Sequence, residues 1–219
     1  MTAPDPDRRA PTWALTLAFV VAIYVAAQML ADITSLRILD IAGFSVDGGT
    51  LIYPLTFTIR DLIHKVGGVR AARMAIFTAA GINLVMVGLF WLVGVLPPDL
   101  AVGSQEGFAD LLSPVARIVL ASIIAEVVSE LLDTEAYRRW VLAFGERYQW
   151  GRVLASNAVA IPVDSAIFVG IAFVGVVPGS VAISIFWANV IVKGAVSVLS
   201  VPLIYTVRPG PDFRVPEEV

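Results

Sequence analysis

The sequence contains no cysteine and only one histidine, His64. Without cysteine, the chain has no disulfide, no thiolate metal site and no cysteine nucleophile. One histidine cannot build the histidine clusters that often bind metals. No run of lysine and arginine marks a nucleic-acid surface. We therefore expect no metal, no cofactor and no nucleic-acid partner.

Charged residues are scarce as well, at 15% of the 219 residues, whereas 58% are hydrophobic and the mean hydropathy is +0.85. Trp13–Ala31 and Met74–Leu96 contain no charge, and a third apolar run, Val177–Tyr205, is interrupted only by Lys193. About 20 residues at a rise of 1.5 Å cross a hydrocarbon layer of ~30 Å. These runs predict an all-α, polytopic membrane protein.

The spacing of the apolar runs predicts six transmembrane helices. We expect a tail over residues 1–12, a transmembrane domain over 13–207 and a second tail over 208–219. The first run is too long for an ordinary signal peptide and lacks a convincing cleavage site, so we expect it to stay as a span. The predicted spans are Trp13–Ala31, Thr50–Val66, Ala72–Leu96, Val115–Leu132, Val153–Val177 and Val181–Val207.

Basic residues are distributed unequally between the segments that connect these spans. The long segment Pro97–Pro114 contains three acids and no lysine or arginine. Cytoplasmic segments of membrane proteins carry the excess of basic residues, so the pattern predicts both termini in the cytoplasm. The basic set comprises Arg8, Arg9, Lys65, Arg70, Arg73, Arg138, Arg139, Arg147, Arg152, Arg208 and Arg214.

Several ionisable residues fall within or at the edge of the predicted spans. A charge at the centre of a lone helix costs about 2.5–3.5 kcal/mol, so these groups should face one another or a watery cavity. Lys193 is far from either end of its apolar run and is expected to neutralise an acid. For three residues a simpler interpretation stays open, since Asp133 can be solvated at a span end, Arg60 can extend to the interface and Asp61 can form an ordinary helix pair with Lys65. The set is Arg60, Asp61, Glu126, Glu130, Asp133, Asp164 and Lys193.

The acids of the fourth span share one helix face, and the fifth span contains a similar but incomplete pattern of polar residues. Glu126, Glu130 and Asp133 fall within about 60° of one another at ~100° per residue. "DTEAY" at Asp133 resembles "DSAIF" at Asp164, and a polar residue precedes each by seven positions, Glu126 and Asn157. Transporters often contain weak internal repeats around a central binding site, although a match this short can arise by chance.

Alanine recurs every fourth residue in the first span, at Ala14, Ala18, Ala22 and Ala26. Small residues at this spacing let helices approach closely. Two interpretations stay open: packing within the chain, or a face for a second copy or an energising partner.

Four segments together resemble the queuosine-precursor transporters, also called the vitamin uptake transporter family. They are "GGTLIYPLTFTIRDLIHKVGGVRAAR", "VARIVLASIIAEVVSELLDTEAY", "LASNAVAIPVDSAIFVGIAF" and "NVIVKGAVSVLSVPLIY". The resemblance implies a six-span importer in the bacterial inner membrane that carries a 7-deazaguanine such as preQ0, preQ1 or queuine. It also implies functional roles for Pro54, Asp61, Asp133, Asp164, Ser165, Lys193 and Pro202, while Glu126, Glu130, Ile161 and Asn189 depart from the family pattern.

The polar residues suit such a base. A deazaguanine presents adjacent ring N–H and amino donors, which one carboxylate can accept together in charge-assisted bonds. Amides can serve the ring carbonyl, and aromatic rings can stack on the base. The predicted substrate-binding residues are Phe57, Asp61, Glu126, Glu130, Asp133, Asn157, Asp164, Ser165, Phe168, Trp187, Asn189 and Lys193.

Three other functions compete with an autonomous importer. The chain could be the substrate-binding membrane subunit of a vitamin uptake system driven by an ATPase. An intramembrane enzyme would need a nucleophile–base pair or metal ligands, which the residue inventory does not favour, so we expect no enzyme. An assembly protein would leave the intramembrane charges unexplained.

Overall fold

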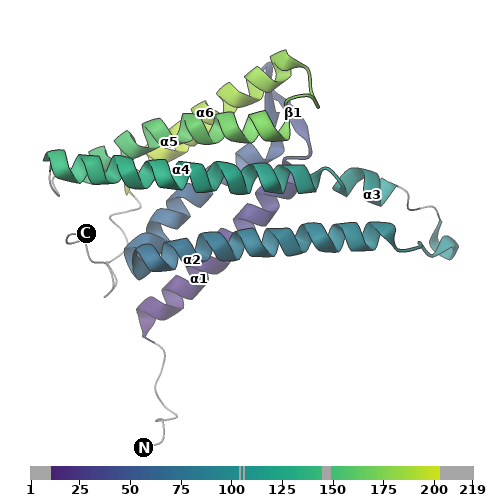
Figure 1. Ribbon diagram of the computed structural model, residues 1–219, viewed down its shortest axis with the longest axis horizontal. Coiled ribbons are helices and arrows are strands. Elements are labelled where there is room, and N and C mark those ends of the chain that lie inside the picture. Colours follow the sequence, from purple (N-terminus) through teal and green to yellow (C-terminus); the bar gives the residue numbers. More distant parts are fainter. Residues whose placement is uncertain (1–10, 104, 106, 145–148, 203–219) are drawn as a thin grey trace, which may run out of the picture.

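A computed structural model describes residues 11–103, 105, 107–144 and 149–202. The chain is mostly helical, as predicted, and Figure 1 shows α4 and α5 lying side by side as long rods. α6 packs along α5, and α1 crosses α2. The helices are α1 (Thr12–Thr34), α2 (Tyr53–Val95), α3 (Gly107–Leu112), α4 (Val115–Phe144), α5 (Gln149–Ala172) and α6 (Gly179–Ser200), with 3₁₀ turns η1 (Gly48–Leu51) and η2 (Leu100–Val102).

Five helical segments of the described chain are long and apolar enough to cross a membrane: Thr12–Thr34, Arg70–Val95, Gly107–Asp133, Val153–Ala172 and Gly179–Leu199. The predicted span Thr50–Val66 is not among them. It is helical from Tyr53, but the stretch up to the bend at Gly68 measures only ~22 Å at 1.5 Å per residue. The sixth span and the cytoplasmic position of both termini therefore stay predictions.

The bend inside α2 lies at Gly68. Its backbone has φ 74° and ψ 179°, a conformation that only glycine adopts without strain. The predicted spans Thr50–Val66 and Ala72–Leu96 lie on either side of this glycine, so the bend separates the two helical parts of α2 that correspond to them. The bend lets the two parts of α2 follow different directions.

A small β-hairpin, which the sequence analysis did not anticipate, follows α1. Strands β1 (Ile38–Ile41) and β2 (Phe44–Asp47) pair antiparallel with Ile41 opposite Phe44. The two connecting residues, Ala42 and Gly43, both have positive φ, as a two-residue hairpin turn requires. Over the residues that the structure describes, the fold is thus helical with one hairpin, and β2 packs against α6.

The 3₁₀ turn η1 passes directly against the end of α1. A Cβ added to Gly49 would overlap the Ser35 hydroxyl and lie 2.6 Å from the Ala31 carbonyl oxygen. Asp47 caps η1 by accepting a hydrogen bond from the Thr50 backbone N–H at 3.1 Å. This close packing fixes the start of α2 relative to α1.

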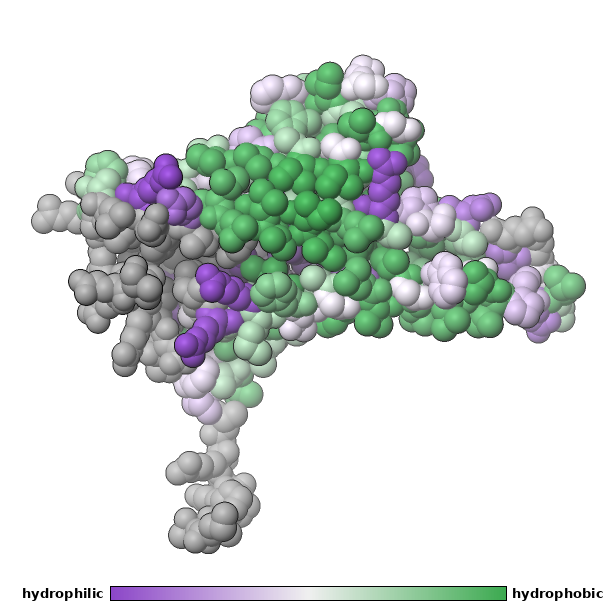
Figure 2. Space-filling view, in the orientation of Figure 1, coloured by the Kyte–Doolittle hydropathy of each residue, from purple (hydrophilic) through white to green (hydrophobic). Residues whose placement is uncertain are grey.

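The outer surface is strongly apolar. Figure 2 shows a broad hydrophobic area across the middle of the molecule with hydrophilic side chains toward its two ends. On α4, this area includes the exposed side chains of Leu120, Ile124, Val127 and Leu131. An exposed apolar area of this kind suits contact with lipid. The buried interior, in contrast, contains most of the polar side chains described below.

Candidate functional site

One face of α1 carries buried polar side chains that contact α4. Tyr24, Gln28 and Asp32 follow one another at intervals of four residues, so they share one face of the helix. The Tyr24 hydroxyl donates a hydrogen bond to Glu126 Oε1, and Gln28 Nε2 donates to the same oxygen at 2.9 Å. α1 therefore places two neutral donors on the carboxylate of Glu126.

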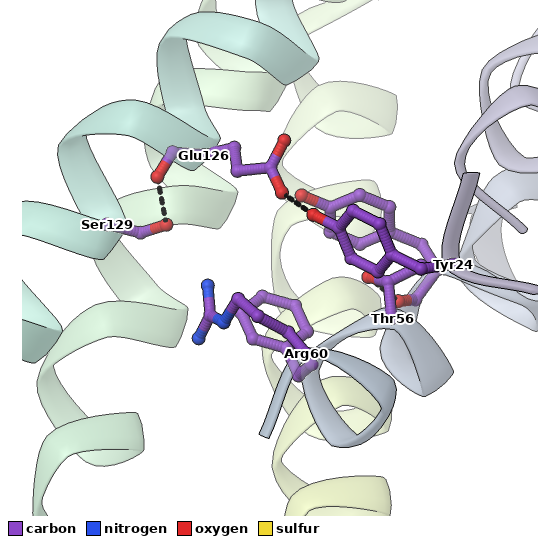
Figure 3. A pocket seen from close by; sticks show the side chains of 7 residues that line it. Tyr24, Thr56, Arg60, Glu126 and Ser129 are labelled. Atoms are coloured by element: carbon purple, nitrogen blue, oxygen red, sulfur yellow. Dashed lines mark hydrogen bonds between the residues drawn. The ribbon is translucent and has the colours of Figure 1, made fainter. Parts of the chain in front are cut away.

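A small pocket lies beside this carboxylate, between α1, α2 and α4. Figure 3 shows Glu126 from α4 and Arg60 from α2 among the side chains that line it. Small-molecule pockets usually measure ~300–1,000 Å³, whereas this one has no room even for a water molecule, so this conformation is a narrow, closed one. The lining residues are Tyr24, Tyr53, Thr56, Phe57, Arg60, Glu126 and Ser129.

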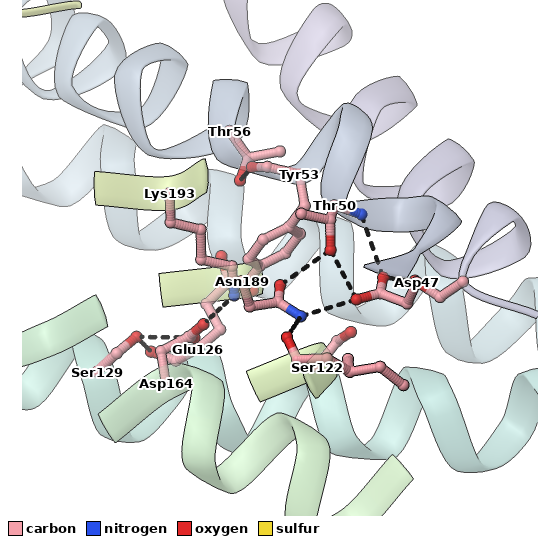
Figure 4. Close-up of polar contacts among 12 residues, drawn as sticks. Asp47, Thr50, Tyr53, Thr56, Ser122, Glu126, Ser129, Asp164, Asn189 and Lys193 are labelled. Atoms are coloured by element: carbon pink, nitrogen blue, oxygen red, sulfur yellow. Dashed lines mark hydrogen bonds and ion pairs between the residues drawn. The ribbon is translucent and has the colours of Figure 1, made fainter. Parts of the chain in front are cut away.

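A buried ion pair joins α5 to α6 next to the pocket (Figure 4). Lys193 Nζ lies 2.6 Å from Asp164 Oδ2, and both side chains are 1% exposed. The predicted neutralisation of an acid by Lys193 is confirmed. The Lys193 ammonium also lies 4.5 Å from the centroid of the Tyr53 ring, within range of a cation–π interaction.

Tyr53 and Ser129 connect the ion pair to the pocket, because each lines the pocket and also contacts the pair. Ser129 Oγ donates to the Glu126 carbonyl oxygen at 3.0 Å and lies 3.4 Å from Asp164 Oδ1. Glu126 and Asp164, two predicted binding residues from different spans, thus lie close together in the polar interior of the helices.

Asn189 belongs to a neighbouring polar cluster around Asp47. Asn189 Nδ2 donates to Asp47 Oδ2 at 2.7 Å, and the Thr50 hydroxyl donates to the same oxygen at 2.6 Å. The Ser35 hydroxyl donates to Asp47 Oδ1 at 2.9 Å. This cluster ties the hairpin and η1 to α1 and α6, and Asn189 is not among the residues that line the pocket.

Asn157, Ser165 and Asp133 are not among the described residues that line the pocket. Asn157 donates to the Ser197 hydroxyl at 2.6 Å and so joins α5 to α6. Ser165 is fully buried, and its hydroxyl has no hydrogen-bond partner among the described residues. Asp133 is partly exposed on α4. The side chains of Asp61 and Glu130 lie outside the part that the structure describes.

The three predicted aromatic residues occupy different environments. Phe57 is buried, lines the pocket and meets Tyr53 edge to face at 5.6 Å between ring centroids. The Phe168 ring lies beside the ion pair, with its centroid 5.8 Å from Lys193 Nζ. Trp187 is 53% exposed and packs against Phe186 on the outer side of α6. Only Phe57 of the three contributes to the pocket wall.

The polar face of α1 was not predicted from the sequence. The predicted first span ends at Ala31, so Asp32, the first charge after the apolar run, was left outside the membrane. The spacing of Tyr24, Gln28 and Asp32 in an otherwise apolar helix was the available signal. For Arg60, extension to the interface had been left open, but the side chain is 7% exposed and lines the pocket, as expected for a charge that faces a cavity.

The alanine face of α1 lies on a different side of the helix from this polar face. Ala14, Ala18, Ala22 and Ala26 line an open apolar groove between α1 and the second part of α2. Thr78 and Ile82 form the α2 side of the groove. Whether a second copy or an energising partner binds there stays a prediction.

Comparison with known proteins identifies the chain's family. The model of the family described as "Putative vitamin uptake transporter" matches residues 47–207. A "Probable queuosine precursor transporter" of Bacillus subtilis (strain 168) is 28% identical over 185 residues, which cover 83% of this chain and 80% of the relative. No solved structure is significantly similar. The chain therefore belongs to the family of putative vitamin uptake transporters, and it is a multi-pass transporter of the bacterial inner membrane rather than an enzyme.

Proposed function

We propose that the protein imports a queuosine precursor, a 7-deazaguanine base, and binds it in the pocket beside Glu126. The observation that carries this proposal is a buried carboxylate facing aromatic rings and a guanidinium in a transporter related to a queuosine precursor transporter. Import of such a base would require a site that replaces the hydrogen bonds the base makes with water.

Glu126 matches one edge of the base. The ring N–H and the amino group of a deazaguanine are neutral donors, as are the Tyr24 hydroxyl and the Gln28 amide. The base would therefore replace Tyr24 and Gln28, which both donate to Oε1 in the narrow conformation, as the donor to this carboxylate. A carboxylate that accepts two N–H groups side by side favours bases with this donor pair over bases that lack it.

Tyr53, Phe57 and Arg60 supply the rest of the recognition. The Tyr53 and Phe57 rings can stack on a planar base, and the Arg60 guanidinium can donate to its ring carbonyl. Since the pocket is narrow, binding requires it to widen. Movement of Tyr24 away from Glu126 would open it on the α1 side. Asp164 and Lys193 hold the wall behind Tyr53 and Ser129 in place.

A thermal-shift screen of the purified protein against preQ0, preQ1, queuine, guanine and several vitamins tests the proposal. We expect stabilisation by one or more of the deazaguanines, a smaller effect of guanine and none from chemically unrelated vitamins. Stabilisation by a vitamin and by none of the deazaguanines would contradict the proposed substrate class.

The alternative is a substrate-binding subunit that needs an ATPase partner. The open groove lined by the alanine face of α1 supports this alternative, because a partner subunit could bind there. Both functions would use the same pocket, so ligand binding does not separate them. Co-purification with an ATPase subunit would support the alternative. Uptake of a deazaguanine by this chain alone in a heterologous host would exclude it.

A further inference from the structure

We propose that Asp32 is a proton-binding site that couples uptake of the base to the proton gradient. Asp32 lies on the polar face of α1 but is not among the residues that line the pocket, so substrate recognition does not explain it. The proposal rests on the proposed function in one respect: a proton can be coupled to uptake only if the protein transports the base.

The environment of Asp32 contains neutral hydrogen-bond partners from two other helices. Asn83 Nδ2 on α2 donates to Asp32 Oδ2 at 2.9 Å, and the Ser122 hydroxyl on α4 donates to Oδ1 at 2.7 Å. Asp32 is 1% exposed. In the described part of the chain, no lysine or arginine forms an ion pair with it. A buried carboxylate without a cation is costly when ionised, which distinguishes Asp32 from Asp164 with its Lys193.

Asn83 provides an independent indication of a second protonation state. Its side chain is 4% exposed, and its Oδ1 has no hydrogen-bond partner among the described residues. A primary amide can turn by half a rotation and exchange its donor for its acceptor. Turned in this way, Asn83 would present Oδ1 to Asp32 and accept a hydrogen bond from the protonated carboxyl group. Asn83 can therefore satisfy Asp32 in both states.

The elements packed around Asp32 carry acids and phenols, and the cation Arg60 of α2 lines the pocket together with Tyr24 and Glu126. On α1 itself, Tyr24 lies two turns before Asp32; on α4, Glu126 lies one turn after Ser122. Tyr53 approaches from the start of α2, and Asp47 lies beyond Ser35 at the end of α1.

Protonation of Asp32 would loosen the contacts that close the pocket. The ionised carboxylate joins α1 to both α2 and α4 through charge-assisted hydrogen bonds. The added proton removes the charge, so the hydrogen bonds of Asp32 to Asn83 and Ser122 become neutral ones, which are roughly half as strong. Gln28, one turn away on α1, donates to Glu126, and movement of α1 would therefore also free the carboxylate that faces the base.

Transport into proteoliposomes tests the coupling. The purified protein is reconstituted, and accumulation of radiolabelled preQ0 or preQ1, whichever binds more tightly, is measured with an inward proton gradient. One proton per uncharged base allows about tenfold accumulation per pH unit. We expect the wild type and the exposed-site control Asp40→Asn to accumulate the base. Asp32→Asn, which keeps a polar side chain without a titrating proton, should bind and exchange the base but only equilibrate it.

Three results would overturn the proposal: accumulation by Asp32→Asn equal to wild type, no effect of the proton gradient on the wild type, or accumulation driven by a sodium gradient instead. If Asp32→Asn does not fold, a second measurement on the wild type replaces this variant: the pH of the external medium is followed when the base is added to the vesicles. The medium should become more alkaline as protons enter with the base, and an unchanged pH overturns the proposal. Binding of the base is measured separately. Its loss in the wild type would contradict the proposed function, whereas binding without proton coupling contradicts only the proton site.

Discussion

At the scale of single residues, the central feature is the carboxylate of Glu126, which accepts hydrogen bonds from Tyr24 and Gln28 and lines the pocket. Substitution by glutamine keeps the size of the side chain and removes its charge. A hydrogen bond to a charged group is worth about 1.5–3 kcal/mol, so Glu126→Gln should weaken binding of the base roughly 10- to 100-fold. Isothermal titration of the purified variant measures this loss.

Glu135→Gln is a matched control for that measurement. It makes the same chemical change on the same helix, but Glu135 forms a surface pair with Arg139 at 2.8 Å. Surface pairs contribute little, so this variant should bind the base like the wild type. Equal affinity of Glu126→Gln and wild type would show that the base binds elsewhere.

The ion pair of Asp164 with Lys193 makes a second prediction about single residues. Removing one member of a buried pair leaves an uncompensated charge and costs about 3–5 kcal/mol. Lys193→Ala should therefore lower the free energy of unfolding by this amount, measured by denaturant titration in detergent. The double variant Asp164→Leu, Lys193→Met should recover most of it, because apolar groups replace both charges. A double variant less stable than Lys193→Ala would contradict a compensated pair.

At the scale of elements, the bend of α2 depends on Gly68. The backbone there is in a region closed to other residues, which costs about 1–3 kcal/mol when a side chain is forced into it. Gly68→Ala should therefore destabilise the protein by this amount in thermal unfolding. Gly88→Ala, in the same helix with open space around the added carbon, is the control and should be neutral or slightly stabilising. Equal stability of both variants would mean that the bend does not need glycine.

The elements also show which features local sequence could reveal. Uncharged runs predicted the long helices because burial in lipid requires apolar residues over a fixed length. The hairpin was missed because its strands are only four residues long and its turn uses Ala42 at positive φ, where asparagine or aspartate is the usual signal. The bend at Gly68 resembles a loop in sequence, since both require glycine.

The pocket could be predicted only in part. Intramembrane acids pointed to Glu126 and Asp164, because an unpaired charge in lipid is costly wherever it occurs. The partners of these acids were harder to identify, since Tyr24 and Ser129 are ordinary residues in a membrane helix. Only the packing of α1 against α4 brings Tyr24 to Glu126, and that packing joins residues 102 positions apart.

At the scale of the whole molecule, six spans with both termini in the cytoplasm remain the predicted topology. The absence of cysteine makes this directly testable with single introduced cysteines and a membrane-impermeant thiol reagent. Asp40→Cys and Asp99→Cys should be labelled from outside the cell, and Arg139→Cys only after the membrane is opened. The two parts of α2 between these positions are predicted to cross the membrane twice. Labelling of Asp40→Cys and Asp99→Cys from opposite sides would contradict these two crossings.

Transport itself tests the account most directly. In a bacterial strain that neither makes nor imports queuosine precursors, the chain is produced alone, and queuosine in transfer RNA is measured after addition of preQ0, preQ1 or queuine at low concentration. We predict that the wild type restores queuosine from at least one of these bases and that Glu126→Gln, produced at the same level, restores much less. No restoration by correctly inserted wild type, or equal restoration by Glu126→Gln, would contradict import through the Glu126 pocket.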